Sequence, residues 1–178
     1  MNICVFSSGA ELEETYTKPA ETFARLLAQN GHSLVCGASD RGMMKVVADT
    51  ASQLGAHITG ITTKMLAYQA RGDKQELLIE EDLGARKAQM QKRSDAFAAL
   101  PGGLGTLDEI AEMMELKKHR VHDKPIVFLN TAGFYEGLKM QLERMEQQNF
   151  LPRPLRELVF FATTPEEAME YIERNAKG

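Results

Sequence analysis

At Pro101-Gly102-Gly103-Leu104-Gly105-Thr106-Leu107-Asp108-Glu109 the chain passes from an apolar run into a segment with helical periodicity. The run Ala96–Leu100 predicts a buried parallel strand, and Leu107–Leu116 predicts a helix. Glycines at a strand-to-helix turn let the backbone approach a ligand closely, and the N–H groups of the first helical turn favour an anion. A carboxylate in that turn would compete with a bound phosphate. Glu109 must therefore have a specific role, either in capping the helix or in catalysis.

Strand and helix patterns alternate along the rest of the chain. We expect further strands over Asn2–Phe6, Ser33–Cys36, His57–Ile61, Glu76–Ile79, Pro125–Leu129 and Leu158–Phe161. We expect further helices over Thr15–Gln29, Met43–Leu54, Leu83–Arg93, Tyr135–Gln148 and Pro165–Arg174, a loop rich in Thr, Gly and Lys before Glu76, and an exposed turn at Arg71–Lys74. The alternation predicts an α/β fold: one doubly wound parallel sheet of about six or seven strands, with helices on both faces and right-handed crossovers. Ligands bind such sheets at the carboxyl ends of the strands.

Length and composition indicate one globular domain, residues 1–178. The chain is 43% hydrophobic and 26% charged, and its formal net charge of −4 gives no electrostatic reason to expect nucleic acid or an anionic membrane as partner. No apolar stretch approaches the length of a membrane helix, and the N-terminus lacks a secretory pattern. Cys4 and Cys36 both fall in expected strands, which predicts buried free thiols and a cytoplasmic location.

Two other glycine turns follow expected strands, and neither matches a standard nucleotide motif. Ser7-Ser8-Gly9-Ala10 is not G-x-G-x-x-G, and the turn that begins at Gly37 has no acidic residue at the end of its strand to hold a ribose. No G-K-[ST] follows any glycine run. These departures argue against a dinucleotide-dependent oxidoreductase and against a phosphate-loop NTPase.

Two interpretations of Glu109 compete. Thr106-x-x-Glu109 matches a capping box, in which Glu109 would accept a hydrogen bond from the Thr106 backbone N–H. Alternatively, helical geometry places three acids, Asp108, Glu112 and Glu115, on a solvent face and Leu107, Ile110 and Met114 on the face packed against the sheet. Glu109 then lies on an apolar flank with Met113 and Leu116. An acid there lines a pocket or an interface, where partial burial would raise its pKa, and the flank itself suggests a dimer.

Other chemistry-bearing residues have simpler interpretations. His119-x-x-His122-Asp123 has the residue types of a metal site, but His119 lies among cations that complement a helix C-terminus, so we expect no metal. Arg86-Lys87 by itself fits a solvated helix face. Nothing in the sequence identifies a pyridoxal phosphate lysine, and we expect no organic cofactor.

The motif P-G-G-x-G-T-x-x-E, with Arg86-Lys87 upstream, resembles the signature of the LONELY GUY (LOG) family of cytokinin riboside 5′-monophosphate phosphoribohydrolases, proteins often labelled lysine decarboxylases. The similarity extends to the Ser-Ser-Gly turn, to Gly37–Asp49 and to His122–Pro125. It implies a Rossmann-like homodimer that hydrolyses the N-glycosidic bond of a nucleoside 5′-monophosphate without metal or cofactor. It also implies that Arg86 and Glu109 are catalytic.

The bond to be cleaved suggests roles for the residues of the site. An oxocarbenium-like ribose would be stabilised by Glu109, which would also orient or deprotonate water, while Arg86 would orient the substrate. The residues expected to bind substrate, mainly at the helix N-terminus that would hold the phosphate, are Ser8, Gly37, Lys87, Gly102, Gly103, Leu104, Gly105, Thr106 and Asp108. AMP or a cytokinin riboside 5′-monophosphate is the expected substrate. The alternative is a protein that binds a nucleotide as sensor or carrier without hydrolysing it.

Four departures from the family pattern favour a changed base site. Gly37-Ala38-Ser39 stands where the family has three glycines, and Lys45 replaces a further glycine. Gly84-Ala85 precedes the Arg-Lys pair, and Glu115–Lys118 replaces a Thr-Trp-Ala-Gln-like segment. We therefore expect the base preference to differ from that of the family.

Overall fold

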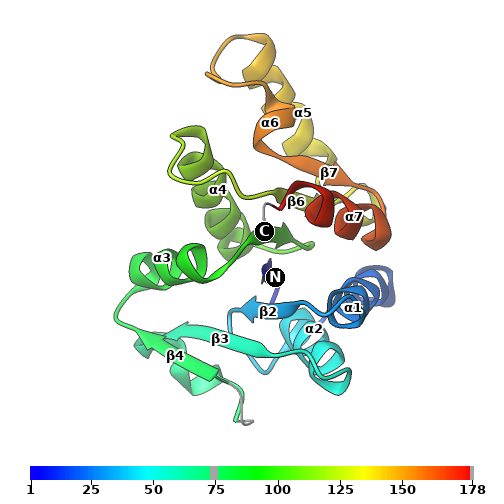
Figure 1. The fold of residues 1–178 in the computed structure, drawn as a ribbon, viewed down its shortest axis with the longest axis vertical. Helices are drawn as coiled ribbons and strands as arrows, with labels where there is room; N and C mark the ends of the chain where they lie inside the picture. The colour runs from blue at the N-terminus through cyan, green and yellow to red at the C-terminus, as the bar shows by residue number, and fades with distance from the viewer. Residues whose placement is uncertain (73–75, 177–178) are drawn as a thin grey trace.

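A computed structural model of the chain describes residues 1–72 and 76–176. Within them, seven strands form one parallel sheet in the order β4-β3-β2-β1-β5-β6-β7 (Figure 1). The strands are β1 (Asn2–Phe6), β2 (Ser33–Cys36), β3 (Ile58–Thr63), β4 (Glu76–Glu80), β5 (Ala96–Ala99), β6 (Ile126–Leu129) and β7 (Phe160–Ala162). The predicted fold class is confirmed.

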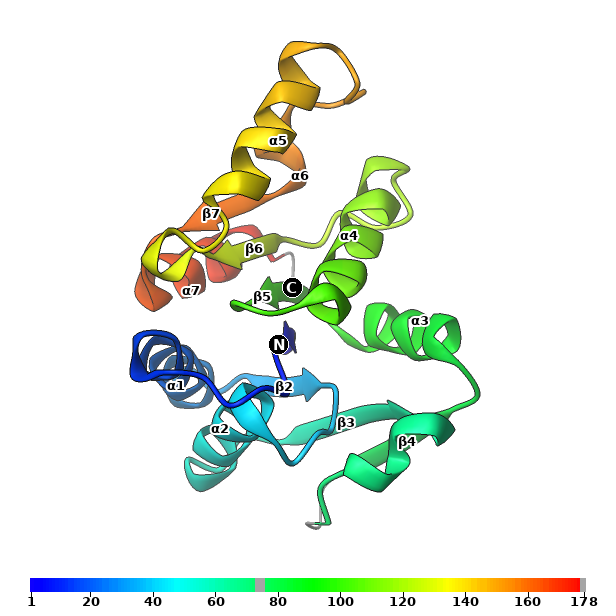
Figure 2. The same ribbon diagram turned by 180° about the vertical axis from the view of Figure 1, so that it is seen from behind.

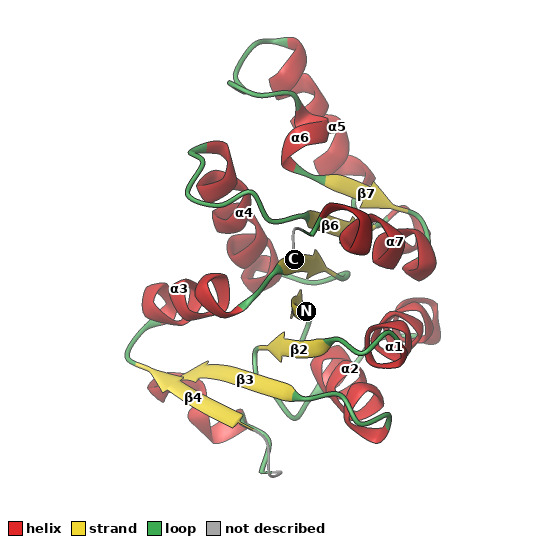
Figure 3. Ribbon diagram, viewed as in Figure 1, coloured by secondary structure: helices red, strands yellow, loops and turns green. Residues whose placement is uncertain are grey.

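Helices cover both faces of this sheet (Figure 3). One face carries α1 (Glu14–Gln29), α2 (Gly42–Gln53) and α7 (Pro165–Asn175). The other carries α3 (Leu83–Arg93), α4 (Leu104–Lys118), α5 (Glu136–Gln147) and the short α6 (Leu155–Leu158). Because side chains alternate along a strand, Ile3 and Val5 of β1 pack in the first layer and Cys4 and Phe6 in the second. The central strands are therefore buried on both faces, as their continuous apolar runs predict.

The topology places the loops after β1 and β5 side by side. β1 pairs with β2 on one side and β5 on the other, and the chain winds outward in both directions from there. Such a reversal leaves a crevice outside the carboxyl ends of the strands. The Pro101–Gly103 turn and the Ser7–Gly9 turn both lie at that edge (Figure 2).

Four expectations about local structure are wrong. Leu158 ends the helix α6, which Pro154 precedes, and the last strand is Phe160–Ala162. The segment before β4 is not all loop, because Lys64–Gln69 forms the 3₁₀ helix η1. Helix α4 begins at Leu104, three residues before the expected start. Of the expected exposed turn, Gly72 is exposed, but the Arg71 side chain is only 12% exposed and its guanidinium lies 2.8 Å from the carboxylate of Asp49. Asp73 and Lys74 lie outside the described residues.

Two further features concern the surroundings of the protein. Cys4 and Cys36 are both buried free thiols, as expected. Among the described residues, none of the helices combines the length and the apolar character required to cross a membrane.

Candidate active site

The residues of the candidate site come from four segments at the carboxyl edge of the sheet. Ser8 follows β1, Gly37 follows β2, and Gly102 and Gly103 follow β5. The first turns of α3 and α4 meet at the same edge, because helices in this topology run antiparallel to the strands they follow. Arg86 lies on α3, and the motif from Leu104 onward forms α4.

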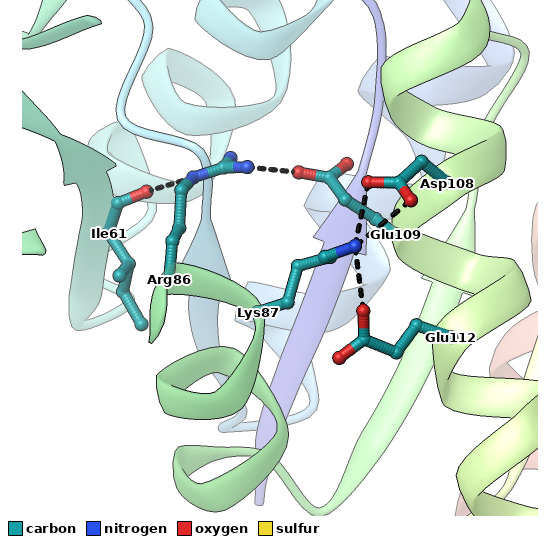
Figure 4. Close-up of polar contacts among 6 residues, drawn as sticks. All are labelled: Ile61, Arg86, Lys87, Asp108, Glu109 and Glu112. Atoms are coloured by element: carbon teal, nitrogen blue, oxygen red, sulfur yellow. Dashed lines mark hydrogen bonds and ion pairs between the residues drawn. The ribbon is translucent and has the colours of Figure 1, made fainter. Parts of the chain in front are cut away.

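Arg86 and Glu109 form a buried ion pair between α3 and α4 (Figure 4). Arg86 Nη1 donates to Glu109 Oε1 at 2.5 Å, and Arg86 Nε donates to the backbone oxygen of Ile61 at 2.9 Å. The two side chains are only 8% and 10% exposed. A buried charged pair requires such partners, since an isolated buried charge is costly. The guanidinium is therefore fixed at both ends of its fork, and it holds the carboxylate in one orientation.

The capping-box interpretation of Glu109 is wrong. Gly103 is the N-cap of α4, so Thr106 lies inside the helix, and the Glu109 carboxylate bonds to Arg86 rather than to a backbone N–H. The expected helix faces are right in part: Asp108 and Glu115 are exposed and Ile110 is buried, but Leu107 and Met114 do not lie on the buried face. The buried face consists of Thr106, Glu109, Ile110, Met113 and Lys117, whereas Leu107 is exposed. Glu109 therefore faces the sheet, and the Arg86 guanidinium makes that placement possible.

Burial raises the pKa of Glu109 above its ordinary value, and the adjacent Arg86 guanidinium opposes this effect. Desolvation is the larger of the two influences because the carboxylate is almost entirely removed from water. A carboxyl group with a raised pKa can accept a proton near neutral pH more readily than an exposed one. The geometry and the electrostatics of Glu109 therefore suit acid–base work.

The Gly102–Thr106 segment forms an open helix N-terminus. The first hydrogen bond at this end of the helix runs from Leu107 N–H to Gly103 O, so the amides of Leu104, Gly105 and Thr106 have no carbonyl one turn back to bond. A Cβ on Gly102 would lie 2.2 Å from Thr106 Oγ1, so only glycine fits there. The side chain of Leu104 is 87% exposed and leaves the amides uncovered. This end can accept an anion.

Lys87 and Asp108 lie together beside the buried pair (Figure 4). Lys87 Nζ is 2.8 Å from Asp108 Oδ2 and 2.6 Å from Glu112 Oε2, and its side chain is 12% exposed. These contacts tie α3 to α4. The solvated-face interpretation of Lys87 is thus wrong, and its role toward a substrate stays a prediction.

Ser8 lines a small hollow next to the glycine segment, and neither Arg86 nor Glu109 is part of its lining. The hollow measures about 200 Å³ and is lined by Ser8, Leu12, Tyr16, Pro101, Gly102, Gly103 and Phe134. Tyr16 and Phe134 meet edge to face with ring centroids 5.9 Å apart. The sequence analysis did not identify these two aromatic residues as part of the site. The one signal that could have indicated them is an aromatic side chain in a loop or in a first helical turn.

The turn after β2 keeps a glycine-like backbone without the family's glycines. Ala38 has φ of +64°, in the left-handed region that disfavours a Cβ. Its Cβ is directed at Gly60, where an added Cβ would lie 2.8 Å away. The Ser39 hydroxyl is buried and has no hydrogen-bond partner among the described residues. The departure from the family pattern therefore places an alanine Cβ in a backbone conformation that glycine favours, next to a buried serine hydroxyl.

The described residues contain no group of three or more His, Cys, Asp or Glu side chains arranged to hold a metal ion. His122 uses both ring nitrogens within the protein: its Nε2 bonds to Met113 O, and its Nδ1 accepts from Lys124 N–H. Burial lowers the pKa of His122 to about 4. The His119–Asp123 segment is therefore held by protein contacts.

Fold and site together define an α/β protein of Rossmann-like topology with a glycine-rich helix N-terminus and a buried Arg–Glu pair at its ligand-binding edge. The solved structures it resembles include a molybdenum cofactor binding protein from Rippkaea orientalis, with a TM-score of 0.74, 24% identity and coverage of 97% of this chain and 95% of that one. A molybdenum cofactor carrier protein from Chlamydomonas reinhardtii matches with a TM-score of 0.73, 20% identity and coverage of 97% and 96%. At such identities these likenesses show the fold alone.

Sequence relatives show the family. A family model described as "Possible lysine decarboxylase" matches residues 44–172. A cytokinin riboside 5′-monophosphate phosphoribohydrolase from Arabidopsis thaliana is 32% identical over 177 residues, which are 98% of this chain and 82% of the relative. A probable enzyme of the same name from Oryza sativa subsp. japonica is 32% identical over 174 residues, 96% of this chain and 70% of the relative. The chain belongs to this family, that of the LONELY GUY proteins.

Proposed function

We propose that the protein hydrolyses the N-glycosidic bond of a nucleoside 5′-monophosphate, with free base and ribose 5-phosphate as products. AMP and cytokinin riboside 5′-monophosphates are the proposed substrates. The observation that carries the proposal is the buried Arg86–Glu109 pair, which lies within one and a half turns of an open, glycine-rich helix N-terminus. The names of the relatives support the same reaction.

The helix N-terminus would hold the 5′-phosphate. Its amides donate hydrogen bonds, and the helix dipole adds roughly half a positive charge at that end. Gly102, Gly103 and Gly105 let the phosphate approach the backbone, and Leu104 and Thr106 contribute their N–H groups. Glu109, one turn further along α4, would then lie on the side of the ribose away from the 5′-phosphate.

Glu109 would act at C1′ of the ribose. As the bond from C1′ to the base nitrogen breaks, the electron pair leaves with the base, and positive charge develops on the ribose. The Glu109 carboxylate stabilises that charge, orients the water whose oxygen bonds to C1′, and accepts its proton. The departing nitrogen takes up a proton from solvent, and Glu109 returns its proton to solvent, so that one water molecule is consumed in each turnover. Arg86 keeps Glu109 in place and orients the substrate, and Ser8, Gly37, Lys87 and Asp108 form the surrounding wall.

We further propose a cytoplasmic homodimer without nucleic acid or membrane partners. An apolar groove of about 370 Å³ runs along α4 and α5, and a second copy of the chain would cover it. The groove, called the α4–α5 groove below, is lined by Leu107, Ile110, Ala111, Met114, Glu115, Lys118, Phe128, Leu138, Leu142, Met145, Phe150, Leu151 and Leu158. The buried free Cys4 and Cys36 suit a reducing compartment.

A second candidate function is nucleotide binding without hydrolysis. The changed turn at Ala38 and Ser39 favours it, because both side chains crowd an edge of the sheet where the family has only glycine. The retained Arg86 and Glu109 favour the enzyme.

The test measures release of base and ribose 5-phosphate from a panel of nucleoside monophosphates. We expect wild type to release both, and Glu109→Gln and Arg86→Lys to lose at least a hundredfold in kcat/KM. An exposed Arg–Glu pair on α7, Arg174 and Glu170, supplies matched controls: Arg174→Lys and Glu170→Gln should keep wild-type rates. Tight binding of a nucleotide without release of base would contradict the enzyme and leave the binding protein.

A further inference from the structure

A second polar hollow lies at the amino edge of the sheet, opposite the candidate active site. The loop 119–125 connects α4 to the amino end of β6 (Figure 1), and the side chain of Arg153, in the segment that precedes α6, reaches this loop and the end of α4. Between them is a hollow of about 450 Å³ lined by Arg120, His122, Asp123 and Arg153. This volume is within the range of small-molecule sites. The lining contrasts with the acidic chain as a whole, whose net charge is −4.

Lys117 contributes an ammonium next to this hollow. The residue as a whole is only 4% exposed, but its Nζ is not among the fully buried polar atoms, and no side-chain hydrogen bond or ion pair joins it to the described residues. Its charge interacts at longer range with Asp123, Arg153 and His122, three of the four lining residues. An ammonium that reaches solvent and has no ion-pair partner among the described residues can take an anion as its partner. An anion in the hollow would provide that partner.

Arg153 is held in a fixed position against the same residues. Its Nη1 donates to Lys117 O at 3.0 Å, its Nε lies 3.3 Å from Glu157 Oε2, and its Nη2 lies 3.7 Å from Asp123 Oδ1. Asp123 is the acid of the lining, and Glu157, which is farther out, is about half exposed. His122 is neutral above its pKa of about 4 and adds no charge near neutral pH. Two cations of the lining, Arg120 and Arg153, together with the nearby Lys117, thus outnumber the carboxylates Asp123 and Glu157.

Arg120 occupies a position where glycine is favoured. Arg120 N–H bonds to Lys117 O and Val121 N–H to Leu116 O, the Schellman pattern that ends a helix, and Arg120 has φ of +61°. A side chain at this position is disfavoured by its Cβ. The guanidinium of Arg120 has no hydrogen bond or ion pair within the described residues, so nothing inside the protein accounts for an arginine there. The same two bonds also cap carbonyls of α4 that would otherwise repel an anion.

We propose that this hollow binds the phosphate group of a small molecule, with Lys117, Arg120 and Arg153 as its ligands. Two guanidinium groups and an ammonium match a tetrahedral dianion, and Arg153 is already oriented for it. The site is independent of the one proposed at the N-terminus of α4, because it lies at the other end of that helix. The bound group is either free phosphate or the phosphate of a nucleotide.

The test follows backbone amides by ¹⁵N NMR while inorganic phosphate is added at constant ionic strength, with sodium chloride as the balancing salt. We expect saturable shifts at residues 119–124 and 153, resolved from any shifts at 103–106. Arg120→Gly and Lys117→Met should weaken binding at 119–124 at least tenfold and leave 103–106 unchanged. A parallel titration with AMP identifies whether the bound phosphate group belongs to a nucleotide. If AMP saturates the shifts at residues 119–124 at a lower concentration than inorganic phosphate does, the ligand is a nucleotide. If AMP binds there equally or more weakly, the ligand is free phosphate.

Arg120→Gly keeps the test independent of folding, since glycine suits that backbone and should raise the midpoint of thermal unfolding. Asn149→Gly is its matched control, because Asn149 has φ of +62° and ends α5 with the same pair of bonds. It should leave phosphate binding at 119–124 unchanged. Absence of saturable shifts there, or shifts that persist in both Arg120→Gly and Lys117→Met, would overturn the proposal.

Discussion

Gly37 lies so close to Arg86 that a Cβ on residue 37 would be 2.7 Å from Arg86 Nη2. That atom is the mobile end of a long side chain, so in Gly37→Ala the guanidinium gives way rather than the backbone. Arg86 would then lose its alignment with Glu109. We expect kcat/KM for nucleotide hydrolysis to fall ten- to a hundredfold, because catalytic groups tolerate displacements of less than about 1 Å.

Stability measurements separate this effect from general damage. The free energy of unfolding of Gly37→Ala should change by less than about 1 kcal/mol, since the contact is relieved by a side-chain movement. Gly137→Ala on α5 is the control, because an added Cβ there meets no atom within 4 Å. It should keep wild-type activity and gain about 0.5–1 kcal/mol from helix propensity. Full activity in Gly37→Ala would show that Arg86 does not need this alignment.

Glu109 should determine the acidic limb of the pH–rate profile. Burial raises the pKa of its carboxyl above the ordinary 4.5, and the reaction uses the ionised form. We therefore expect kcat/KM to rise with pH with an apparent pKa above 4.5, and we expect the residual activity of Glu109→Gln to lack this limb. A profile that is flat from pH 4.5 to 7 in wild type would exclude Glu109 as the base.

The same shift has a defined effect on stability. Because the folded pKa is raised, the contribution of Glu109 is fully present below pH 4.5 and is lost as the pH rises through the folded value. The free energy of unfolding of wild type, relative to Glu109→Gln, should therefore decrease from pH 4 to pH 7. Urea titrations at several pH values measure the difference, and an increase over that range would contradict the raised pKa.

The sheet was predictable because its strands are buried on both faces. Runs such as Ala96–Leu100 are too short for helices and are bounded by glycine or proline, so length and flanking residues identify them as strands. The strand predicted over Leu158–Phe161 begins too early. Leu155 and Leu158 are core residues, and the one-turn helix after Pro154 buries their side chains as effectively as a strand would. Periodicity over four residues does not separate these two outcomes.

The site was predictable in its membership and not in its geometry. The motif and the Arg86-Lys87 pair identified residues that the fold brings together. The burial of Glu109 beside Met113 was predicted, but its ion pair with Arg86, 23 residues away, was not, and the helical wheel wrongly assigned Leu107 to the buried face. Leu107 and Met114 instead line the α4–α5 groove. Whether such a carboxylate is buried depends on a charged partner far away in the sequence, and no local sequence pattern indicates that partner.

His122 should make the protein sensitive to acid. Burial lowers its pKa from 6.5 to about 4, so its contribution to stability is present above pH 6.5 and is lost as the pH falls through the folded value. The full effect is on the order of 3–4 kcal/mol, as one pKa unit corresponds to about 1.4 kcal/mol. NMR titration of the ring should give a pKa below 5. In His122→Gln the corresponding loss between pH 6.5 and 4 should be absent, and a ring pKa near 6.5 would contradict its burial.

The α4–α5 groove should be the dimer interface, so a charge within it should separate the subunits. Met114 lines the groove, and Met114→Glu would place a carboxylate against its apolar wall. We expect sedimentation equilibrium to give a dimer for wild type and a monomer, or a dissociation constant raised at least a hundredfold, for Met114→Glu. Met65→Glu is the matched control, since Met65 is exposed on η1 and lies outside the groove. A wild-type dimer that survives Met114→Glu would move the interface to another face, and a wild-type monomer would exclude the dimer.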